Sequence, residues 1–309
     1  MEFRRVTILG AGAIGAYLIW GLSQKPEIEL TVVASGNWKQ RLETEGLWIN
    51  GRQYYPKTIT PAEARGTDLL IVALKYGALH ASLPEIKEIV SDNTVVMSLM
   101  NGVDSEEIIG TAVGAEKVIY SVIKIASERN GNRIDFDPAA AGGMTYGEKD
   151  PRRGTERIEA LNELFTGTGL RFRSSDAIMT DIWGKFLRNV RFNLTQAVLG
   201  CGFGVMRDSE HAAFIAEKLG AEVEMLAKAK GIDLSKCDKT IPTPGQIPDR
   251  TVFSTLQDLK AKRHTEIEMF SGAIVRMAAE EGISVPYNEM VYHIIKALEE
   301  KNDGLFDYS

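Results

Sequence analysis

The feature that most constrains the fold is a set of three glycines near the N-terminus. In VTILGAGAIGAYLIWGL, Gly10, Gly12 and Gly15 follow an apolar β-branched run and open an apolar helical pattern. In a strand–turn–helix unit, such glycines permit a tight turn, close approach of the backbone to a pyrophosphate, and close packing of helix on strand. The motif predicts a dinucleotide site, and a glycine-rich turn without a ligand is the alternative. The expected cofactor contacts are Gly10, Ala11, Gly12, Ala13, Ile14 and Gly15.

The rest of the first half has the pattern of a parallel sheet covered on both faces. Near-continuous apolar runs alternate with amphipathic segments, which is typical of a doubly wound β-α-β-α domain. A turn-rich zone at residues 117–148 should add antiparallel strands. The expected strands are residues 5–10, 30–35, 68–74 and 94–99, and the expected helices include residues 13–24 and 80–90.

The second half has long helical patterns and few strand candidates. A proline-rich loop, residues 241–250, interrupts it. We therefore expect a Rossmann-type α/β domain at residues 1–175, followed by an all-α domain at residues 176–309. The expected helices of this half are residues 181–199, 210–230, 257–281 and 286–300.

Composition excludes several classes of protein. The net charge of −6 gives no electrostatic footprint for nucleic acid. No apolar run approaches the roughly 20 residues of a membrane span. Cys201 and Cys237 are the only cysteines, which suits a reducing compartment, and the four histidines lack metal-ligand spacing. We expect a cytoplasmic protein with no metal, membrane or nucleic-acid partner.

The residues after the second apolar run bear on the choice of cofactor. An NAD site usually has a carboxylate there to hold the ribose 2′-hydroxyl. This chain instead has Ser35, Asn37, Lys39 and Arg41. Hydroxyl, amide and cationic groups favour a 2′-phosphate, so the sequence predicts NADP(H). The alternative is that Lys39 and Arg41 only cover a solvated helix face.

Two further residues follow apolar runs. Lys75 comes just past the third run and Asn101 just past the fourth. In open α/β sheets, ligands bind outside the carboxyl ends of the strands, so both residues are candidates for cofactor contact. Asn101 with Gly102 is also an ordinary turn pair. A turn and a site therefore remain open for Asn101.

A polar stripe marks the helical pattern at residues 181–199. Lys185, Asn189 and Asn193 recur every four residues within a largely apolar surface, whereas Arg188 and Arg191 fall on the opposite face. Burying an ammonium and two amides without partners costs several kcal/mol. Either internal hydrogen bonds or a polar ligand should meet this stripe.

A later segment, FSTLQDLKAKRHTEIEMFSGAIV, has polar candidates of its own. Ser254 and Gln257 fit an S-x-x-Q capping box, which favours a helix cap over a ligand contact for Ser254. Glu266 and Glu268 lie within the expected helix at residues 257–281. Local pattern alone favours a surface or salt-bridge role for Glu266.

Together these segments resemble a known family. The motifs GAGAIG, LKYG, NGVDSEE, WGKFLRNVRFN, STLQD and RHTEIE, in this order and at this spacing, resemble the ketopantoate reductase (2-dehydropantoate 2-reductase) family. The resemblance extends from residue 5 to about residue 286. It implies NADPH-dependent reduction of 2-dehydropantoate to (R)-pantoate, toward coenzyme A, in a cleft between a Rossmann domain and a helical domain.

The resemblance also implies roles for the polar residues. Lys185 matches the catalytic lysine that protonates the carbonyl oxygen, and Glu266 matches the acid near the nicotinamide. A cationic lysine can both stabilise the developing alkoxide and supply its proton. The implied substrate contacts are Asn189, Asn193 and Ser254. The implied cofactor contacts beyond the glycine motif are Lys75, Asn101 and Ala126.

Four positions depart from the family pattern and leave the substrate and the cofactor preference open. Leu194 stands where Pro or Ala is frequent, Phe203 where relatives carry Asn, Met100 where Gln is frequent, and Ser35 where Arg often follows the strand. One alternative is a paralogue that reduces another 2-oxo acid. Another is a non-catalytic NADP-binding sensor. A homodimer is expected from the resemblance alone.

Overall fold

The computed structural model describes residues 1–306 and 308, which form two compact units. The first unit is Met1–Met179 and the second is Thr180–Ser309. This division falls a few residues beyond the boundary expected after residue 175. Each unit has its own secondary-structure class and its own core.

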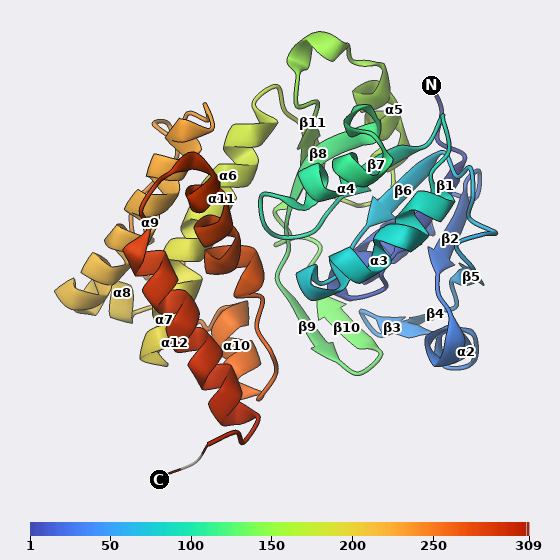
Figure 1. The fold of residues 1–309 in the computed structure, drawn as a ribbon. Coiled ribbons are helices and arrows are strands. Elements are labelled where there is room, and N and C mark those ends of the chain that lie inside the picture. The colour runs from blue at the N-terminus through green and yellow to red at the C-terminus, as the bar shows by residue number, and fades with distance from the viewer. Residues whose placement is uncertain (307, 309) are drawn as a thin grey trace. The chain divides into compact units, whose positions relative to one another are not determined.

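The first unit is built on an eight-stranded sheet (Figure 1). Five adjacent parallel pairings join the first six strands from one edge, and the seventh strand is antiparallel to the sixth. This arrangement confirms the predicted α/β class. In spatial order the strands are β5 (Lys57–Ile59), β2 (Glu29–Val33), β1 (Arg5–Leu9), β6 (Leu69–Val72), β7 (Val95–Ser98), β8 (Val118–Lys124), β11 (Gly143–Gly147) and β12 (Phe172–Ser174).

Helices connect these strands and cover the sheet. On one face, α3 and α4 contact each other (Figure 1). The helix α1 contacts strands of a second, smaller sheet. The helices of this unit are α1 (Ala13–Leu22), α2 (Gly36–Thr44), α3 (Tyr76–Ile89), α4 (Ser105–Val113) and α5 (Glu156–Phe165), with short 3₁₀ turns η1 (Ala115–Lys117) and η2 (Pro151–Arg153).

The smaller sheet has four short strands, of which two were not predicted. The turn-rich zone does contain antiparallel pairs, as expected, but β8 itself pairs in parallel with β7. Phe136 packs edge-on against Tyr17 and Trp20 and so ties this sheet to α1. In spatial order the strands are β4 (Arg52–Tyr54), β3 (Leu47–Ile49), β10 (Arg133–Phe136) and β9 (Ser127–Asn130).

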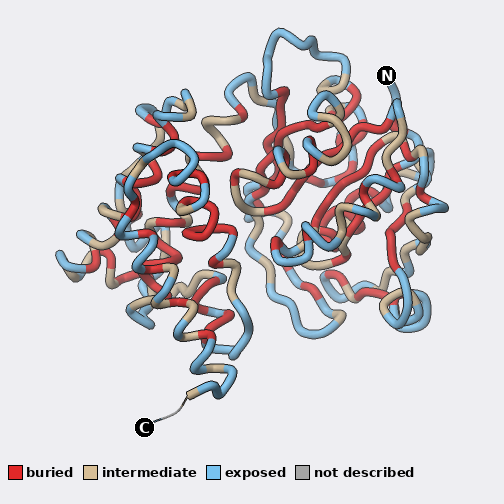
Figure 2. Tube along the Cα trace, in the orientation of Figure 1, coloured by how far each residue is buried: buried red, intermediate tan, exposed pale blue. Residues whose placement is uncertain are grey.

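The core of the first unit follows from its apolar runs. Strands β6 and β7 are buried along their whole length, as Figure 2 shows in red. One polar residue in this core, Thr7, is satisfied by hydroxyl hydrogen bonds with Thr31 (2.9 Å) and Thr67 (2.9 Å). Removing so much apolar surface from water is the main favourable term in folding.

The second unit is helical, and no strand occurs among its described residues. This confirms the predicted all-α class. Within the residues that the structure describes, no helix is both long and apolar enough to cross a membrane. The elements are α6 (Ile178–Asn189), η3 (Val190–Leu194), α7 (Thr195–Leu199), α8 (Val205–Asp208), α9 (Glu210–Ala229), α10 (Ser254–Lys260), η4 (Glu268–Gly272), α11 (Ala273–Glu281) and α12 (Pro286–Asn302).

The prediction of one helix over residues 257–281 is wrong. Helix α10 ends at Lys260, and Lys262 takes a left-handed conformation with φ of 52°. The amide of Arg263 then donates to the carbonyl of Asp258 at 2.8 Å, which closes the end of the helix. Such a left-handed residue is a common helix terminator. Its consequence is that Glu266 lies in a turn before η4 and not inside a helix.

Candidate active site

The glycine loop has the geometry that the sequence motif predicts. Gly10 has φ of 106°, and a side chain there would meet the carbonyl oxygen of Ala73 at 2.6 Å. A side chain at Gly15 would overlap the carbonyl oxygen of Gly10. The space beside Gly12 is open, and its nearest neighbour is the Nη1 of Arg129 at 3.7 Å. Glycine is therefore required for packing at two positions and leaves room for a ligand at the third.

The start of helix α1 is suited to an anion. Gly12 is its N-cap, and the first turn has no acidic residue. Free amides and the helix dipole both favour a phosphate at such an end. Arg129 on β9 adds a cation beside the same loop. The sequence reading missed Arg129, because only the folded hairpin brings residue 129 to residue 12.

A cavity of about 170 Å³ adjoins the glycine loop. It lies where β1 and β2 end, and α3 closes its other side. A dinucleotide bound at the glycine motif places its adenosine half at this edge of the sheet. The lining residues are Leu9, Gly10, Val33, Ala34, Ser35, Trp38, Pro61, Leu74, Ser82 and Glu85.

The two cations that favoured NADP(H) have other partners. The ammonium of Lys39 lies 3.9 Å from the carboxylate of Glu43, and the guanidinium of Arg41 lies 3.7 Å from that of Glu45. Both pairs join residues four apart along α2 and its C-cap, and neither cation lines the cavity. They have the arrangement of a solvated helix face. The preference for NADP(H) stays a prediction.

The other expected cofactor contacts follow three neighbouring parallel strands. Lys75 is the N-cap of α3 after β6, Asn101 lies in the loop after β7, and Ala126 lies between β8 and β9. The carboxyl ends of parallel strands meet at one edge of a sheet. The structure therefore brings these three residues to the edge that carries the glycine loop.

A buried network holds the loop of Asn101. The hydroxyl of Ser98, at the end of β7, lies 2.8 Å from that of Ser105, which donates to Glu106 at 2.8 Å. The other oxygen of Glu106 accepts from the amide of Ser121 at 3.2 Å. Burial raises the pKa of Glu106 from 4.5 to about 7, although these hydrogen bonds oppose the rise. The network joins both ends of the loop to β8.

This raised pKa predicts a pH dependence of stability. Because the unfolded chain releases the Glu106 proton near pH 4.5 and the folded chain near pH 7, stability should fall as pH rises between these values. A shift of this size corresponds to about 3 kcal/mol. Urea unfolding at a series of pH values should show this slope in the wild type and lose it in Glu106→Gln. Glu107→Gln, exposed on the same helix, should keep the slope; an unchanged slope in Glu106→Gln would contradict the assignment.

The polar stripe of the second unit lies on α6 and η3. Lys185 and Asn189 are half-buried, and Asn193 is 7% exposed. Within the described part of the chain, the side-chain amides of Asn189 and Asn193 make no hydrogen bond to protein. The internal satisfaction considered from the sequence is therefore not observed for the two amides. The two amides are therefore open to a polar ligand or to water.

A π-helical segment alters the geometry of this stripe. In an α-helix, four residues overshoot a full turn by about 40°. Residues Val190–Leu194 instead form a π-helix, whose turns hold more residues. The step from Asn189 to Asn193 therefore rotates less, and Asn193 returns toward the face of Lys185. The sequence pattern predicted a continuous helix and did not distinguish this turn.

Ser254 is not the helix cap that its local sequence suggests. Phe253 occupies the N-cap of α10, and the Gln257 side chain donates to the carbonyl of Val252 at 2.7 Å. Ser254 is exposed, and its hydroxyl has no hydrogen-bond partner among the described residues. Because α10 contacts η3, this hydroxyl lies on an element packed beside Asn193. The hydroxyl is available to a ligand.

The buried side-chain amide of Gln196 fixes the backbone segment that precedes Ser254. Gln196, fully buried on α7, donates to the carbonyl of Thr251 at 2.8 Å and accepts from the amide of Phe253 at 3.0 Å. These two bonds hold the backbone just before Ser254. The sequence reading missed Gln196, although it falls three residues after Asn193 and so continues the polar residues of the same helix.

Removing this amide should weaken substrate binding more than it slows chemistry. We expect Gln196→Leu to raise KM for the substrate roughly tenfold, because a loosened backbone misplaces Ser254. Dinucleotide binding, in the other unit, should stay unchanged. Gln196→Glu keeps the acceptor for the amide of Phe253, so its KM should fall between those of wild type and Gln196→Leu. Steady-state kinetics give the KM for the substrate, and cofactor titration gives the affinity for the dinucleotide. A change in cofactor affinity alone would refute the positioning role.

Glu266 lies in a turn that is held from α12. The amide and hydroxyl of Thr265 both donate to Glu299 at 2.7 Å. Burial would raise the pKa of Glu299, but hydrogen bonds from Thr265 and Lys296 outweigh it and lower the pKa. Its carboxylate is thus a firm anchor for the segment. By contrast, Glu268 lies on the surface, near Arg276 (3.8 Å).

Aromatic packing joins the helix of Lys185 to the segment that follows Glu266. Phe186, next to Lys185, stacks on Phe270 with ring centroids 6.1 Å apart. Phe270 belongs to η4, one turn after Glu266. The pair therefore joins α6 to η4. Lys185 and Asn193 lie on the consecutive elements α6 and η3, and Ser254 lies on α10, which contacts η3. Glu266 lies in the turn that leads into η4.

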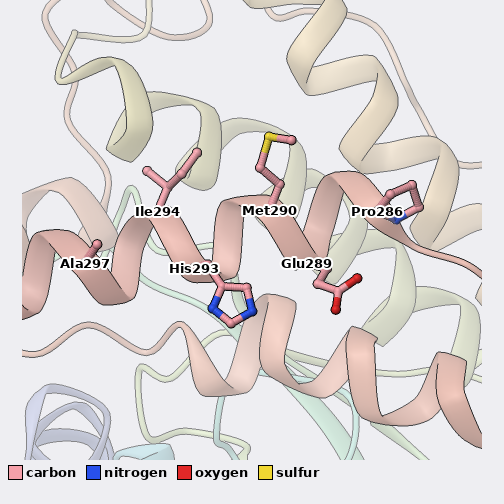
Figure 3. Close-up of a pocket in the computed structure, with 6 residues that line it drawn as sticks. All are labelled: Pro286, Glu289, Met290, His293, Ile294 and Ala297. Carbon is pink, nitrogen blue, oxygen red and sulfur yellow. The ribbon is translucent and has the colours of Figure 1, made fainter.

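A larger hollow on the second unit contains none of these residues. Its volume is about 570 Å³, and all its lining side chains project from α12 (Figure 3). Figure 3 shows Glu289 and His293 on one side of the helix and Met290 and Ile294 on the other. One helix cannot enclose a ligand. We therefore assign this hollow to the surface and not to the candidate site.

Comparisons with known proteins agree with this fold. A doubly wound unit with a glycine-rich loop, followed by a helical unit, is an architecture of dinucleotide-dependent oxidoreductases. The family model ketopantoate reductase PanE/ApbA matches residues 6–151, and its C-terminal model matches residues 177–299. The chain belongs to the ketopantoate reductase family.

Similar proteins span nearly the whole chain. The 2-dehydropantoate 2-reductase of Pyrococcus horikoshii is 28% identical, covering 97% of this chain and 99% of the relative. A ketopantoate reductase from Ralstonia eutropha has a TM-score of 0.79 at 23% identity, covering 96% and 99%. D-mandelate dehydrogenase in complex with NADH has a TM-score of 0.83 at 22% identity, also covering 96% and 99%. These last two show the shared fold.

Proposed function

We propose that the protein reduces 2-dehydropantoate to (R)-pantoate with a nicotinamide dinucleotide. The observation that carries the proposal is the pair of amides, Asn189 and Asn193, that lack protein partners on the helix of Lys185. A 2-oxo acid presents a carbonyl and a carboxylate, which such amides can bind. Family membership over both units supports the same reaction.

The proposed mechanism divides the work among five side chains. When bound, the reduced nicotinamide supplies a hydride to the 2-oxo carbon. Lys185 stabilises the developing alkoxide and protonates it, while Glu266 contacts the new hydroxyl. The substrate contacts are Asn189, Asn193 and Ser254. Gly10–Gly15, Lys75, Asn101 and Ala126 are proposed to hold the cofactor.

Both NADPH, which the sequence predicts, and NADH are candidate hydride donors. The two molecules have the same nicotinamide and differ only at the ribose 2′ position. The chemistry at Lys185 is therefore independent of that choice. Binding at the adenosine end decides it.

Two alternatives lead to different assay results. A paralogue that reduces another 2-oxo acid would keep the roles of Lys185 and Glu266. Phe203, a departure from the family pattern, is fully buried and packs against Phe192 and against Phe253, the residue before Ser254. A non-catalytic sensor would bind the dinucleotide without turnover.

The decisive experiment follows nicotinamide absorbance with purified protein. Ketopantoate and a panel of other 2-oxo acids are compared, each with NADPH and with NADH. We expect the highest kcat/KM for ketopantoate. A higher value for another acid would select the paralogue. No turnover in protein that binds the dinucleotide would select the sensor.

The assembly state belongs to the same proposal. We propose a homodimer, as a relative from Staphylococcus aureus is described as a dimeric ketopantoate reductase. Sedimentation of the purified protein measures this directly. A monomer at assay concentration would overturn it without affecting the proposed chemistry.

A further inference from the structure

The cavity beside the glycine loop contains a single charged side chain, and that side chain is an acid. Glu85 lines it from α3, and Ser35, the N-cap of α2, lines it as well. The carboxylate is half-buried and has no ion pair or hydrogen bond among the described residues. The other polar groups of the lining are the hydroxyls of Ser35 and Ser82 and the indole N–H of Trp38. The cavity therefore offers hydroxyl groups and a negative charge.

A 2′-phosphate needs the opposite environment. It carries between one and two negative charges near neutral pH and is usually met by arginine or lysine. The nearest candidates in sequence, Lys39 and Arg41, lie beside Glu43 and Glu45 and do not line the cavity. No cation among the described lining residues could compensate the phosphate.

On the side of Pro61, the charges just outside the lining do not reverse this balance, and Arg129 lies at Gly12, in the part of the loop expected to meet the pyrophosphate. Glu63 lies two residues after Pro61 and is fixed by the amide (2.7 Å) and hydroxyl (2.9 Å) of Thr60. These hydrogen bonds lower the pKa of Glu63, with a smaller contribution from Lys39 and Lys57. Lys39 is thus attracted by a second carboxylate besides Glu43. Glu63 therefore adds a carboxylate on the side of Pro61, and the lysines near it already interact with carboxylates.

We infer that this protein prefers NAD(H) to NADP(H), and that Glu85 is the residue that discriminates against the 2′-phosphate. The inference rests on the dinucleotide site of the proposed function and differs from the sequence-based prediction of NADP(H). An NAD site usually takes its acid from the end of the second strand. Here that position is Ser35, and α3 supplies the acid from across the cavity.

The size of the effect follows from electrostatics. Two like charges several ångströms apart, in a partly solvated cavity, repel by about 1 to 2 kcal/mol. Since about 1.4 kcal/mol is a factor of ten, we expect NADH to bind roughly tenfold more tightly than NADPH. The difference should shrink when the charge of Glu85 is removed and should decrease at high salt.

The test is a calorimetric or fluorescence titration of NADH and NADPH, without any 2-oxo acid, on three proteins. Wild type, Glu85→Gln and Glu88→Gln are compared. Glu88 lies on the same helix, is exposed and does not line the cavity, so its variant makes the same charge change elsewhere. Glu85→Gln should bind NADPH roughly tenfold more tightly and NADH within about twofold of wild type. Glu88→Gln should match wild type.

Three results would overturn the inference. They are tighter binding of NADPH than NADH by wild type, equal weakening of both cofactors in Glu85→Gln, and the same response in Glu88→Gln. Equal weakening would mean that Glu85 holds the adenosine and does not discriminate. Failure of the proposed function has another signature, namely no turnover of any 2-oxo acid while both titrations remain intact.

Discussion

Replacing Lys185 by methionine should lower kcat roughly a thousandfold or more while leaving dinucleotide binding intact. The change removes both the stabilisation of the alkoxide and its proton donor, each of which contributes a large factor in comparable reactions. The cofactor is proposed to bind residues of the other unit. Single-turnover measurement of nicotinamide oxidation, with titration of the cofactor, separates the two effects.

A second substitution separates the two roles of the lysine. Lys185→Arg keeps a cation for the alkoxide, but a guanidinium does not release its proton. Turnover should therefore remain low in Lys185→Arg if proton donation is essential. Lys228→Met, on the exposed side of α9, is the control and should retain wild-type activity. Near wild-type turnover in Lys185→Met would refute the assigned mechanism.

Replacing Glu222 by alanine should destabilise the helical unit by about 3 to 5 kcal/mol. Glu222, buried on α9, accepts hydrogen bonds at the start of α12 from the amides of Tyr287 (2.9 Å) and Asn288 (2.8 Å). It also accepts from the side-chain amide of Asn288 at 2.7 Å. Helix α12 has no side-chain cap of its own. The substitution leaves three donors without their acceptor.

Chemical unfolding together with hydrogen exchange measures this effect. Exchange of the amides at the start of α12 should accelerate in Glu222→Ala, because the cap is lost there first. Glu222→Gln keeps one acceptor oxygen, so its free energy of unfolding should fall between those of Glu222→Ala and wild type. Glu217→Ala, exposed on the same helix, should change stability by less than about 0.5 kcal/mol. Equal loss in both alanine variants would argue against the capping role.

Local patterns predicted much of this protein because they report local physics. The glycine spacing at residues 10–15 indicated a strand–turn–helix unit, since only glycine fits two of its positions. The near-continuous apolar runs indicated a parallel sheet buried on both faces. The four-residue recurrence of Lys185, Asn189 and Asn193 placed them on one helix face. These features depend on residues close in sequence, so a pattern can show them.

Other features depend on contacts between distant segments. Ser254 has the local sequence of a cap, yet Gln196 holds the preceding backbone so that its hydroxyl stays available. The π-helix at Val190–Leu194 is packed against α9 and α10, and the pattern at residues 181–199 has no sign of it. The break after Lys260 ended a helix that amphipathic spacing would have continued.

The cavity beside the glycine loop shows most clearly which features follow from local sequence and which follow from the fold. Sequence indicated that a dinucleotide cradle follows the first strand, because at two of its glycines, Gly10 and Gly15, any side chain would overlap the backbone. It also placed Lys39 and Arg41 near the end of the second strand. Only the tertiary structure decided which charge lines the cavity, since Glu85 comes from a helix some 50 residues further along the chain. The sign of a local field depends on through-space distances, and the fold alone sets those distances.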